Sequence, residues 1–282
     1  MTDTFGGRLA AQFVAGRRLC VGIDPHASTL AAWQLDDTAA NAERLGREVV
    51  AAAAGEVACI KPQIAFFERF GSAGYVALER VFADAREAGL IVIADVKRGD
   101  IGSTFAAYAD AWLKPGSPLE ADAMTVHAYQ GLGTLAGASE YTSEHGKGLF
   151  VLSATSNPEA KAVQLAHVET GETLAQYVLS GARDMNTAKG GEVGSVGVVL
   201  GATVNLDDFA IDRTATHGGP VVPVLAPGFG FQGASVGEVR ELFGSLAAGV
   251  LVSESRSIVN GGAAQLGNNI ALSNERIMEA YA

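Results

Sequence analysis

Short apolar runs rich in β-branched residues recur along this chain, and longer segments rich in Ala, Glu and Leu separate them. The apolar runs lack strict alternation with polar residues, which is typical of strands buried on both faces of a parallel sheet. They predict strands at residues 19–24, 57–61, 90–96, 121–127, 148–153, 195–200, 221–226 and 249–253. The segments between them predict helices at residues 38–54, 74–88, 103–113, 170–188 and 236–246, among others.

Eight predicted strands that alternate with helices favour an α/β fold, and specifically a (β/α)8 TIM barrel over an open sheet. We find no linker, low-complexity segment or charge block that divides the chain. Residues 1–282 are therefore expected to form a single barrel domain. The stretch 153–170 is longer than a usual βα loop and is interpreted as a lid or an insertion, whereas the role of 203–220 stays open.

The third predicted strand ends in closely spaced charges. Residues 91–104 read IVIADVKRGDIGST, so four apolar residues lead into Asp95, Lys97 and Asp100. Asp95 and Lys97 are two positions apart and so point to the same face of a strand. Charges at the end of a buried strand are costly unless they pair or act chemically. An isolated Asp-x-Lys is typical of a structural ion pair, but Asp100 and Thr104 follow at once and favour a catalytic site.

Other strand ends carry polar residues as well. In a barrel the chemistry occurs at the carboxyl ends of the strands, so these residues are candidates for the same site. They are Asp24 after the first strand, Lys61 after the second, Ser153 and Ser156 after the fifth, Pro227 and Gln232 after the seventh, and Arg256 after the eighth.

The loop at 227–233 reads PGFGFQG and contains G-x-G-x-x-G, the pattern of a Rossmann dinucleotide site. That fingerprint should follow the first strand of a βαβ unit, and this one follows the seventh predicted strand. A phosphate cradle is the better interpretation, because barrels often bind phosphate in the loops after strands seven and eight. Arg256 would add a planar fork of donors for phosphate oxygens. The alternative for Arg256 is a salt bridge at the barrel rim.

The composition of the chain indicates which classes of partner and which cellular compartment to expect. The chain is 48% hydrophobic and 18% charged, with a net charge of −11. The acidic balance argues against nucleic-acid or anionic-membrane partners. Charged or Gly residues interrupt every long apolar run, and we see no cationic leader before an apolar stretch, so a cytoplasmic protein is expected. Cys20 and Cys59 are expected to be buried free thiols, and none of the five histidines has a metal-binding spacing, so no metal is expected.

The pattern D-x-K-x-x-D-I-x-x-T at 95–104 resembles the signature of the orotidine 5′-phosphate decarboxylase family. The segment ADVKRGDIGST resembles the bacterial type 2 subgroup of this family, and residues that match the family occur along nearly the whole chain. The resemblance implies a TIM-barrel carboxy-lyase that converts orotidine 5′-phosphate (OMP) to UMP and CO2 in de novo pyrimidine biosynthesis. It also implies that no metal or organic cofactor takes part.

The resemblance also implies roles for particular residues. Lys97 would stabilise the carbanion at C6 and then protonate it, while Asp95, Asp100 and Lys61 would hold Lys97 in place. The substrate contacts would be Asp24 with the ribose, Ser156 (or Ser153) with the pyrimidine, and Gln232 and Arg256 with the phosphate, and Pro227 would also bind the substrate. Family members are dimers, so Asp100, Ile101 and Thr104 would serve the site of the neighbouring subunit in a homodimer.

Two other functions are considered. A Mg²⁺-dependent sugar-phosphate decarboxylase or aldolase of the same suprafamily also shows D-x-K-x-x-D, but Lys61 and the Gln232 loop disfavour it. A catalytically silent phosphate-binding barrel is disfavoured by the intact set of Lys61, Asp95, Lys97 and Asp100.

Overall fold

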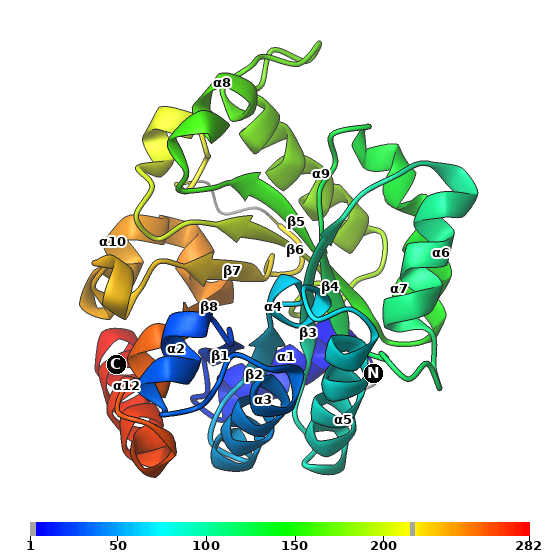
Figure 1. Cartoon of the computed structure of the whole chain (residues 1–282). Helices are drawn as coiled ribbons and strands as arrows, with labels where there is room; N and C mark the ends of the chain where they lie inside the picture. Colours follow the sequence, from blue (N-terminus) through cyan, green and yellow to red (C-terminus); the bar gives the residue numbers. More distant parts are fainter. Residues whose placement is uncertain (1–3, 215–217) are drawn as a thin grey trace.

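The computed structural model describes residues 4–214 and 218–282, and it confirms the predicted α/β barrel (Figure 1). Every predicted strand overlaps an observed one. The strands are β1 (Leu19–Ile23), β2 (Cys59–Pro62), β3 (Ile93–Arg98), β4 (Ala123–Val126), β5 (Gly148–Ala154), β6 (Val196–Leu200), β7 (Val224–Pro227) and β8 (Val250–Glu254).

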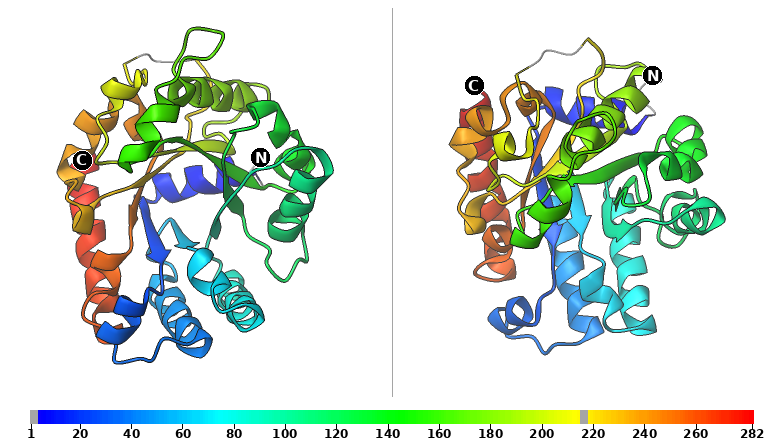
Figure 2. Two further views of the ribbon diagram at one scale, coloured as in Figure 1. Left: turned by 45° about the horizontal axis from the view of Figure 1, so that its top comes forward. Right: turned by 90° about the horizontal axis from the view of Figure 1, so that it is seen from above.

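The strands form one parallel sheet in the order β2-β1-β8-β7-β6-β5-β4-β3. Parallel bridges pair Ile60 with Val92 and Gln63 with Asp95, and so join β2 to β3. These bridges close the sheet into a barrel, with the longer helices on its outside (Figures 1 and 2). Closure gathers the carboxyl ends of the strands at one mouth, where the sequence analysis expects the chemistry.

The predicted helices are present at four of the five segments, as α3 (Ala39–Ala53), α5 (Ser72–Glu87), α6 (Gly102–Leu113) and α9 (Leu174–Thr187). The fifth segment, 236–246, is broken into the 3₁₀ turn η5 (Val236–Glu238), α10 (Val239–Phe243) and η6 (Gly244–Gly249). The break occurs because Gly244 has φ +54° and its Cα lies against the carbonyl of Arg213, where a Cβ would be 2.3 Å from the oxygen.

Further helices complete the outer layer and the loops. They are α1 (Phe5–Val14), α2 (Ala27–Ala32), α4 (Ala65–Glu68), α7 (Ser139–Glu144), α8 (Lys161–Gln164), α11 (Arg256–Val259) and α12 (Leu266–Tyr281). The remaining 3₁₀ turns are η1 (Leu132–Ala138), η2 (Pro158–Ala160), η3 (Leu206–Phe209), η4 (Gly230–Gln232) and η7 (Ala263–Gln265). The long 153–170 stretch thus contains η2 and α8, and 203–220 contains η3 as well as residues 215–217, which lie outside the described part.

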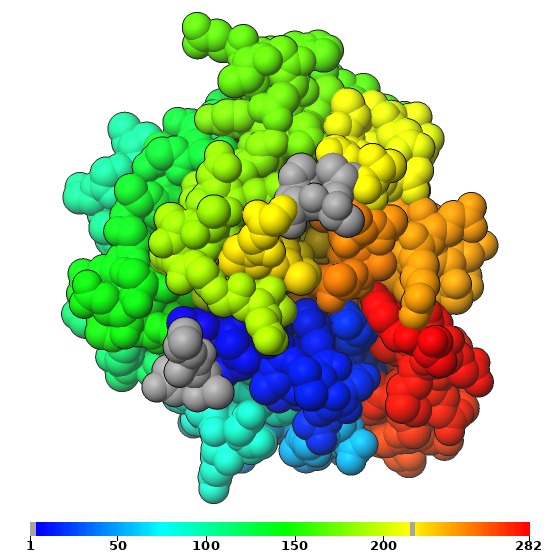
Figure 3. All heavy atoms as spheres, turned by 180° about the vertical axis from the view of Figure 1, so that it is seen from behind, coloured from blue at the N-terminus to red at the C-terminus, as the bar shows by residue number. Residues whose placement is uncertain are grey.

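Helix α1 closes the amino end of the barrel and was not predicted. Its Phe5 and Leu9 are fully buried against the first inward-facing layer of the strands, which includes Cys20, Cys59 and Phe150. The Phe5 and Phe150 rings meet edge to face with centroids 5.8 Å apart. Figure 3 shows the N-terminal segment in blue on this face of the molecule. The two cysteines are buried free thiols, as predicted.

Candidate active site

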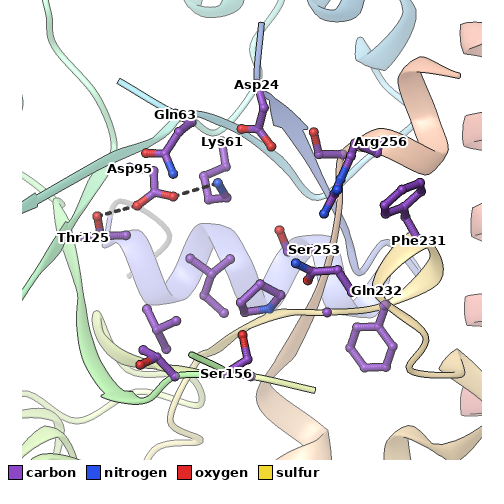
Figure 4. A pocket seen from close by; sticks show the side chains of 18 of the residues that line it. Asp24, Lys61, Gln63, Asp95, Thr125, Ser156, Phe231, Gln232, Ser253 and Arg256 are labelled. Carbon is purple, nitrogen blue, oxygen red and sulfur yellow. Dashed lines mark hydrogen bonds and ion pairs between the residues drawn. The ribbon is translucent and has the colours of Figure 1, made fainter. Parts of the chain in front are cut away.

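A cavity of about 430 Å³ opens at the carboxyl ends of the strands (Figure 4). All eight strands or the loops that directly follow them contribute to its lining, as expected for a closed barrel. Its polar residues include Asp24, Lys61, Gln63, Asp95, Lys97, Thr125, Thr155, Ser156, Gln232, Ser253, Ser255 and Arg256.

Asp95 is at the centre of the hydrogen-bond network in this cavity. Its Oδ2 lies 2.8 Å from Lys61 Nζ, and its Oδ1 lies 2.6 Å from Lys97 Nζ. Thr125 Oγ1 donates a third bond to Oδ1 at 2.8 Å. The Asp95 and Lys61 side chains are only 7% and 9% exposed, whereas Lys97 is 46% exposed and reaches into the open cavity. One buried carboxylate therefore holds two ammonium groups on one side of the pocket.

These charges stabilise one another's ionised forms. Burial alone would raise the pKa of Asp95, but the positive charges of Lys61 and Lys97 outweigh it and hold this pKa well below its usual range. Burial alone would lower the pKa of Lys61, but the negative charges of Asp95 and Asp24 outweigh it, so this pKa is raised. Both groups are therefore ionised around neutral pH.

The backbone of Lys97 is unusual. Its φ is +48°, in the left-handed region that non-glycine residues seldom adopt. The pairing of β3 with β4 shifts at this point: Ala94 pairs with Met124, but Arg98 pairs with Val126. Four positions on β3 thus correspond to two on β4. The Lys97 N–H donates to Thr125 Oγ1 at 2.9 Å.

Asp24 occupies the wall next to Lys61 and has spare bonding capacity. Its Oδ1 is buried and has no hydrogen-bond partner within the described residues. The buried Ser255 Oγ, also in the lining, has none there either. Buried polar atoms are normally satisfied, and leaving them unpaired costs free energy. A ligand with hydroxyl groups could satisfy both atoms.

The end of the cavity next to Arg256 combines a guanidinium with a glycine-rich loop, an arrangement that can accept an anion. Gly228, Gly230 and Gly233 all have positive φ, which lets the loop fold closely around the cavity. Arg256 is the first residue of α11, and its guanidinium carbon lies 4.0 Å from the centre of the Phe231 ring (Figure 4). Stacking on a ring covers the face of the guanidinium but leaves its N–H edge available. Arg256 pairs with no carboxylate of residues 4–214 or 218–282, so the rim salt bridge is absent from this part.

Comparisons with known proteins identify the family. The model of the "Orotidine 5′-phosphate decarboxylase / HUMPS family" matches residues 17–260. Curated orotidine 5′-phosphate decarboxylases are 50% identical in Nocardioides sp. (90% of this chain, 91% of the relative) and 47% identical in Salinispora arenicola (92% and 91%). This chain belongs to the orotidine 5′-phosphate decarboxylase family. The family predicted from the residues is thus confirmed.

A solved structure from Streptomyces avermitilis, assigned to orotidine 5′-phosphate decarboxylase, matches with a TM-score of 0.89 and 43% identity. The match covers 99% of this chain and 96% of that one. A structure from Methanocaldococcus jannaschii, at 16% identity and a TM-score of 0.61, shows the shared fold alone. Among the described residues, no helix combines the length and apolar character needed to cross a membrane.

Most residues predicted for this decarboxylase-family site lie around the one cavity. They are Asp24, Lys61, Asp95, Lys97, Ser156, Pro227, Gln232 and Arg256. Ser153 is buried outside the lining, and its Oγ donates to the carbonyl of Ala175 in α9 at 2.8 Å, so Ser156 is the serine that faces the cavity.

Three predicted residues lie away from the cavity of their own chain. Asp100, Ile101 and Thr104 precede or begin α6 and are absent from the lining. Asp100 Oδ1 accepts the N–H of Ile101 at 2.8 Å, and Ile101 is 60% exposed. The exposed Ile101 thus lies at the surface of this chain, next to the position of Asp100.

Sequence reasoning assigned no role in the decarboxylase-family site to Thr125, Gln63 or Phe231. Gln63 follows Lys61 by two positions, and its Oε1 accepts from Lys97 Nζ at 3.5 Å. The two-residue spacing from Lys61 could have revealed it, because alternate strand residues face the same way. Phe231 lies inside the glycine loop and gives no signal of its contact with Arg256.

We predict that Asp95→Asn lowers stability in a pH-dependent way. Removing one partner of a buried ion pair costs about 3–5 kcal/mol, because the other charge stays buried. Since folding lowers the pKa of Asp95, the wild-type advantage is present above the unfolded pKa of about 4 and is lost as pH falls through the folded value. Urea unfolding of both proteins at a series of pH values measures this difference.

The matched control is Asp84→Asn, which breaks the exposed pair with Arg47 and should change stability far less. A stability difference between wild type and Asp95→Asn that stays constant from neutral pH into the acid range would contradict the expected linkage.

Proposed function

We propose that this site decarboxylates OMP to UMP and CO2, with Lys97 as the group that acts on the reacting carbon. The observation that supports this most directly is the pairing of Lys61 and Lys97 with the single buried carboxylate of Asp95. The relatives from Nocardioides and Salinispora bear the name of this activity. The proposed substrate is also compatible with a cavity that has an arginine at one end and two lysines on another wall.

The proposed chemistry requires no electron sink in the enzyme. The bond between C6 and the carboxylate breaks, CO2 leaves, and the electron pair stays on C6. The ammonium of Lys97 stabilises this negative charge and then transfers a proton to C6, which gives UMP and a neutral lysine amine. A proton from solvent restores the ammonium, and the 46% exposure of Lys97 gives water access to it.

The remaining lining residues suggest how the substrate lies. We place the phosphate at Arg256 and Gln232, the ribose hydroxyls at Asp24, and the pyrimidine beside Ser156. This orientation brings the C6 carboxylate towards Asp95 and Lys97. Repulsion between that carboxylate and Asp95 would be relieved when CO2 leaves, so it favours the transition state over the bound substrate.

The Mg²⁺-dependent alternative fits the site less well. Both Asp95 oxygens are engaged by ammonium groups, so a divalent cation near Asp95 would face two positive charges. Carboxylate ligands of Mg²⁺ need free oxygens. The charge arrangement therefore favours a reaction without a metal at this position.

We also propose that the protein is a homodimer in the cytoplasm, with Asp100, Ile101 and Thr104 completing the partner's site. The support is their position: all three lie at the start of α6, away from the cavity of their own chain. In the proposed dimer, the exposed Ile101 would be covered by the partner.

The function is tested by following OMP loss through its ultraviolet absorbance in buffer containing EDTA. We expect wild-type activity to persist, and Lys97→Ala to lower kcat by more than about 10⁴-fold, because it removes both a fixed cation and a positioned acid. Activity that depends on added Mg²⁺ would support the alternative chemistry. A Lys97→Ala enzyme that keeps a tenth of the wild-type kcat would contradict the role of Lys97.

Arg256 is tested with two substrates. We predict that Arg256→Ala lowers kcat/KM for OMP by at least about 10²-fold, because charge-assisted bonds to phosphate are strong. The same change should matter far less for orotidine, which lacks the phosphate. An equal proportional loss on orotidine would show that Arg256 supports the fold or the reacting centre instead.

The shared site is tested by mixing two inactive variants. If Asp100 acts in the partner's site, a heterodimer of Lys97→Ala and Asp100→Ala chains has one site free of both changes. Random exchange between isologous subunits would then restore about a quarter of the wild-type activity. Mixed chains that exchange subunits, shown by mass spectrometry with one chain isotope-labelled, yet stay inactive would place Asp100 in its own site.

A further inference from the structure

Thr125 makes two hydrogen bonds that the proposed chemistry does not yet account for. It lies on β4, is only 1% exposed, and borders the cavity. Its Oγ1 accepts the N–H of Lys97 at 2.9 Å. The same Oγ1 donates to Asp95 Oδ1 at 2.8 Å (Figure 4). A single hydroxyl therefore connects the backbone of one charged residue to the side chain of the other.

The chemistry of the two partners fixes the direction of both bonds. A backbone N–H can only donate, and an ionised carboxylate can only accept. The low pKa of Asp95 keeps it ionised. The Thr125 hydroxyl must then accept from Lys97 and donate to Asp95, so its proton has one orientation.

The bond to the Lys97 N–H lies where the pairing of β3 with β4 is irregular. The register shifts between Ala94 and Arg98, and within this stretch the Lys97 N–H donates to the Thr125 side chain. A left-handed backbone at a non-glycine residue costs about 1–2 kcal/mol and persists only where its surroundings hold it. Among the described residues, Thr125 provides the oxygen that accepts the hydrogen bond from the N–H of this strained residue.

The bond to Asp95 fixes the carboxylate from which both lysines are positioned. Oδ1 receives both the Thr125 hydroxyl and Lys97 Nζ, while Oδ2 receives Lys61 Nζ. A carboxylate free to rotate would move both ammonium groups. A displacement of 1 Å near the reacting atoms can lower the rate by about 10²-fold.

We propose that Thr125 is a positioning residue for this reaction, acting through the Lys97 backbone and the Asp95 carboxylate. The proposal rests on the proposed function, since it assigns Thr125 to the alignment of the Lys97 ammonium with C6. Its role depends on the hydroxyl, because a side chain of the same shape without one would leave the Lys97 N–H unpaired and Oδ1 without its second donor.

The test compares Thr125→Val with Thr125→Ser. Val keeps the shape and removes the hydroxyl, so we expect kcat for OMP to fall by at least about 10-fold while KM changes by less than about 3-fold. Ser keeps the hydroxyl and should retain kcat within about 3-fold of wild type. Steady-state kinetics on OMP, with thermal unfolding of each variant, provide both readouts.

Thr142→Val is the matched control. Thr142 in α7 is 5% exposed, accepts from Lys189 Nζ at 2.7 Å and donates to the carbonyl of Ser139 at 3.1 Å, and none of these three residues lines the cavity. The Thr142→Val change therefore removes the same kind of hydroxyl from a similarly buried side chain. We expect the kcat of this variant to stay within about 2-fold of wild type.

The outcomes separate this inference from the proposed function. A wild-type enzyme that leaves OMP unchanged would refute the proposed function itself. With an active wild type, a Thr125→Val kcat within 2-fold of wild type would overturn the inference. A Thr125→Ser enzyme as impaired as Thr125→Val, or a kcat loss matched by Thr142→Val, would also overturn it, because the effect would then not depend on the positioned hydroxyl.

Discussion

The rest of the site depends on the two bonds that Lys61 and Lys97 donate to the Asp95 carboxylate. Two ammonium groups close together would repel each other, and burying Lys61 alone would be costly. The shared carboxylate removes both problems, since each of its oxygens faces one lysine. The closed barrel makes this possible, because Lys61 and Asp95 come from neighbouring strands that meet at the closure.

The positively charged side chains of the site lie in two separate parts of the cavity. The lysines and Asp95 lie on the walls formed by β2 and β3, while Arg256 follows β8 and meets the glycine loop after β7. A ligand with two anionic groups can therefore be held at both ends, although the whole chain has a net charge of −11. The negative net charge therefore describes mainly the outer surface, whereas the electrostatic potential inside the cavity is set by the residues that line it.

The strands were predictable because both of their faces are buried, which leaves unbroken apolar runs in the sequence. Asp95, Lys97 and Lys61 were predictable as candidates for one site because they follow such runs at the carboxyl ends of strands, where a barrel gathers its polar residues. Thr125 was not, because threonine is an ordinary strand residue and its hydroxyl gives no signal of what it will bind. The separation of Asp100 from the cavity could not be predicted from spacing either. Asp100 is only three positions from Lys97, but the left-handed turn at Lys97 redirects the chain between them.

Because α1 closes the amino end of the barrel, it limits where molecules can enter and leave the cavity. Phe5 and Leu9 fill the amino end with apolar side chains, so within the described residues the cavity communicates with solvent at the carboxyl-end mouth. In the proposed reaction, the substrate, both products and the water that reprotonates Lys97 would then share a single opening. CO2 is a small uncharged gas that can pass a bound nucleotide there, whereas in the proposed orientation the nucleotide would first have to release its phosphate from Arg256. The sealed floor thus favours an order in which CO2 leaves before UMP.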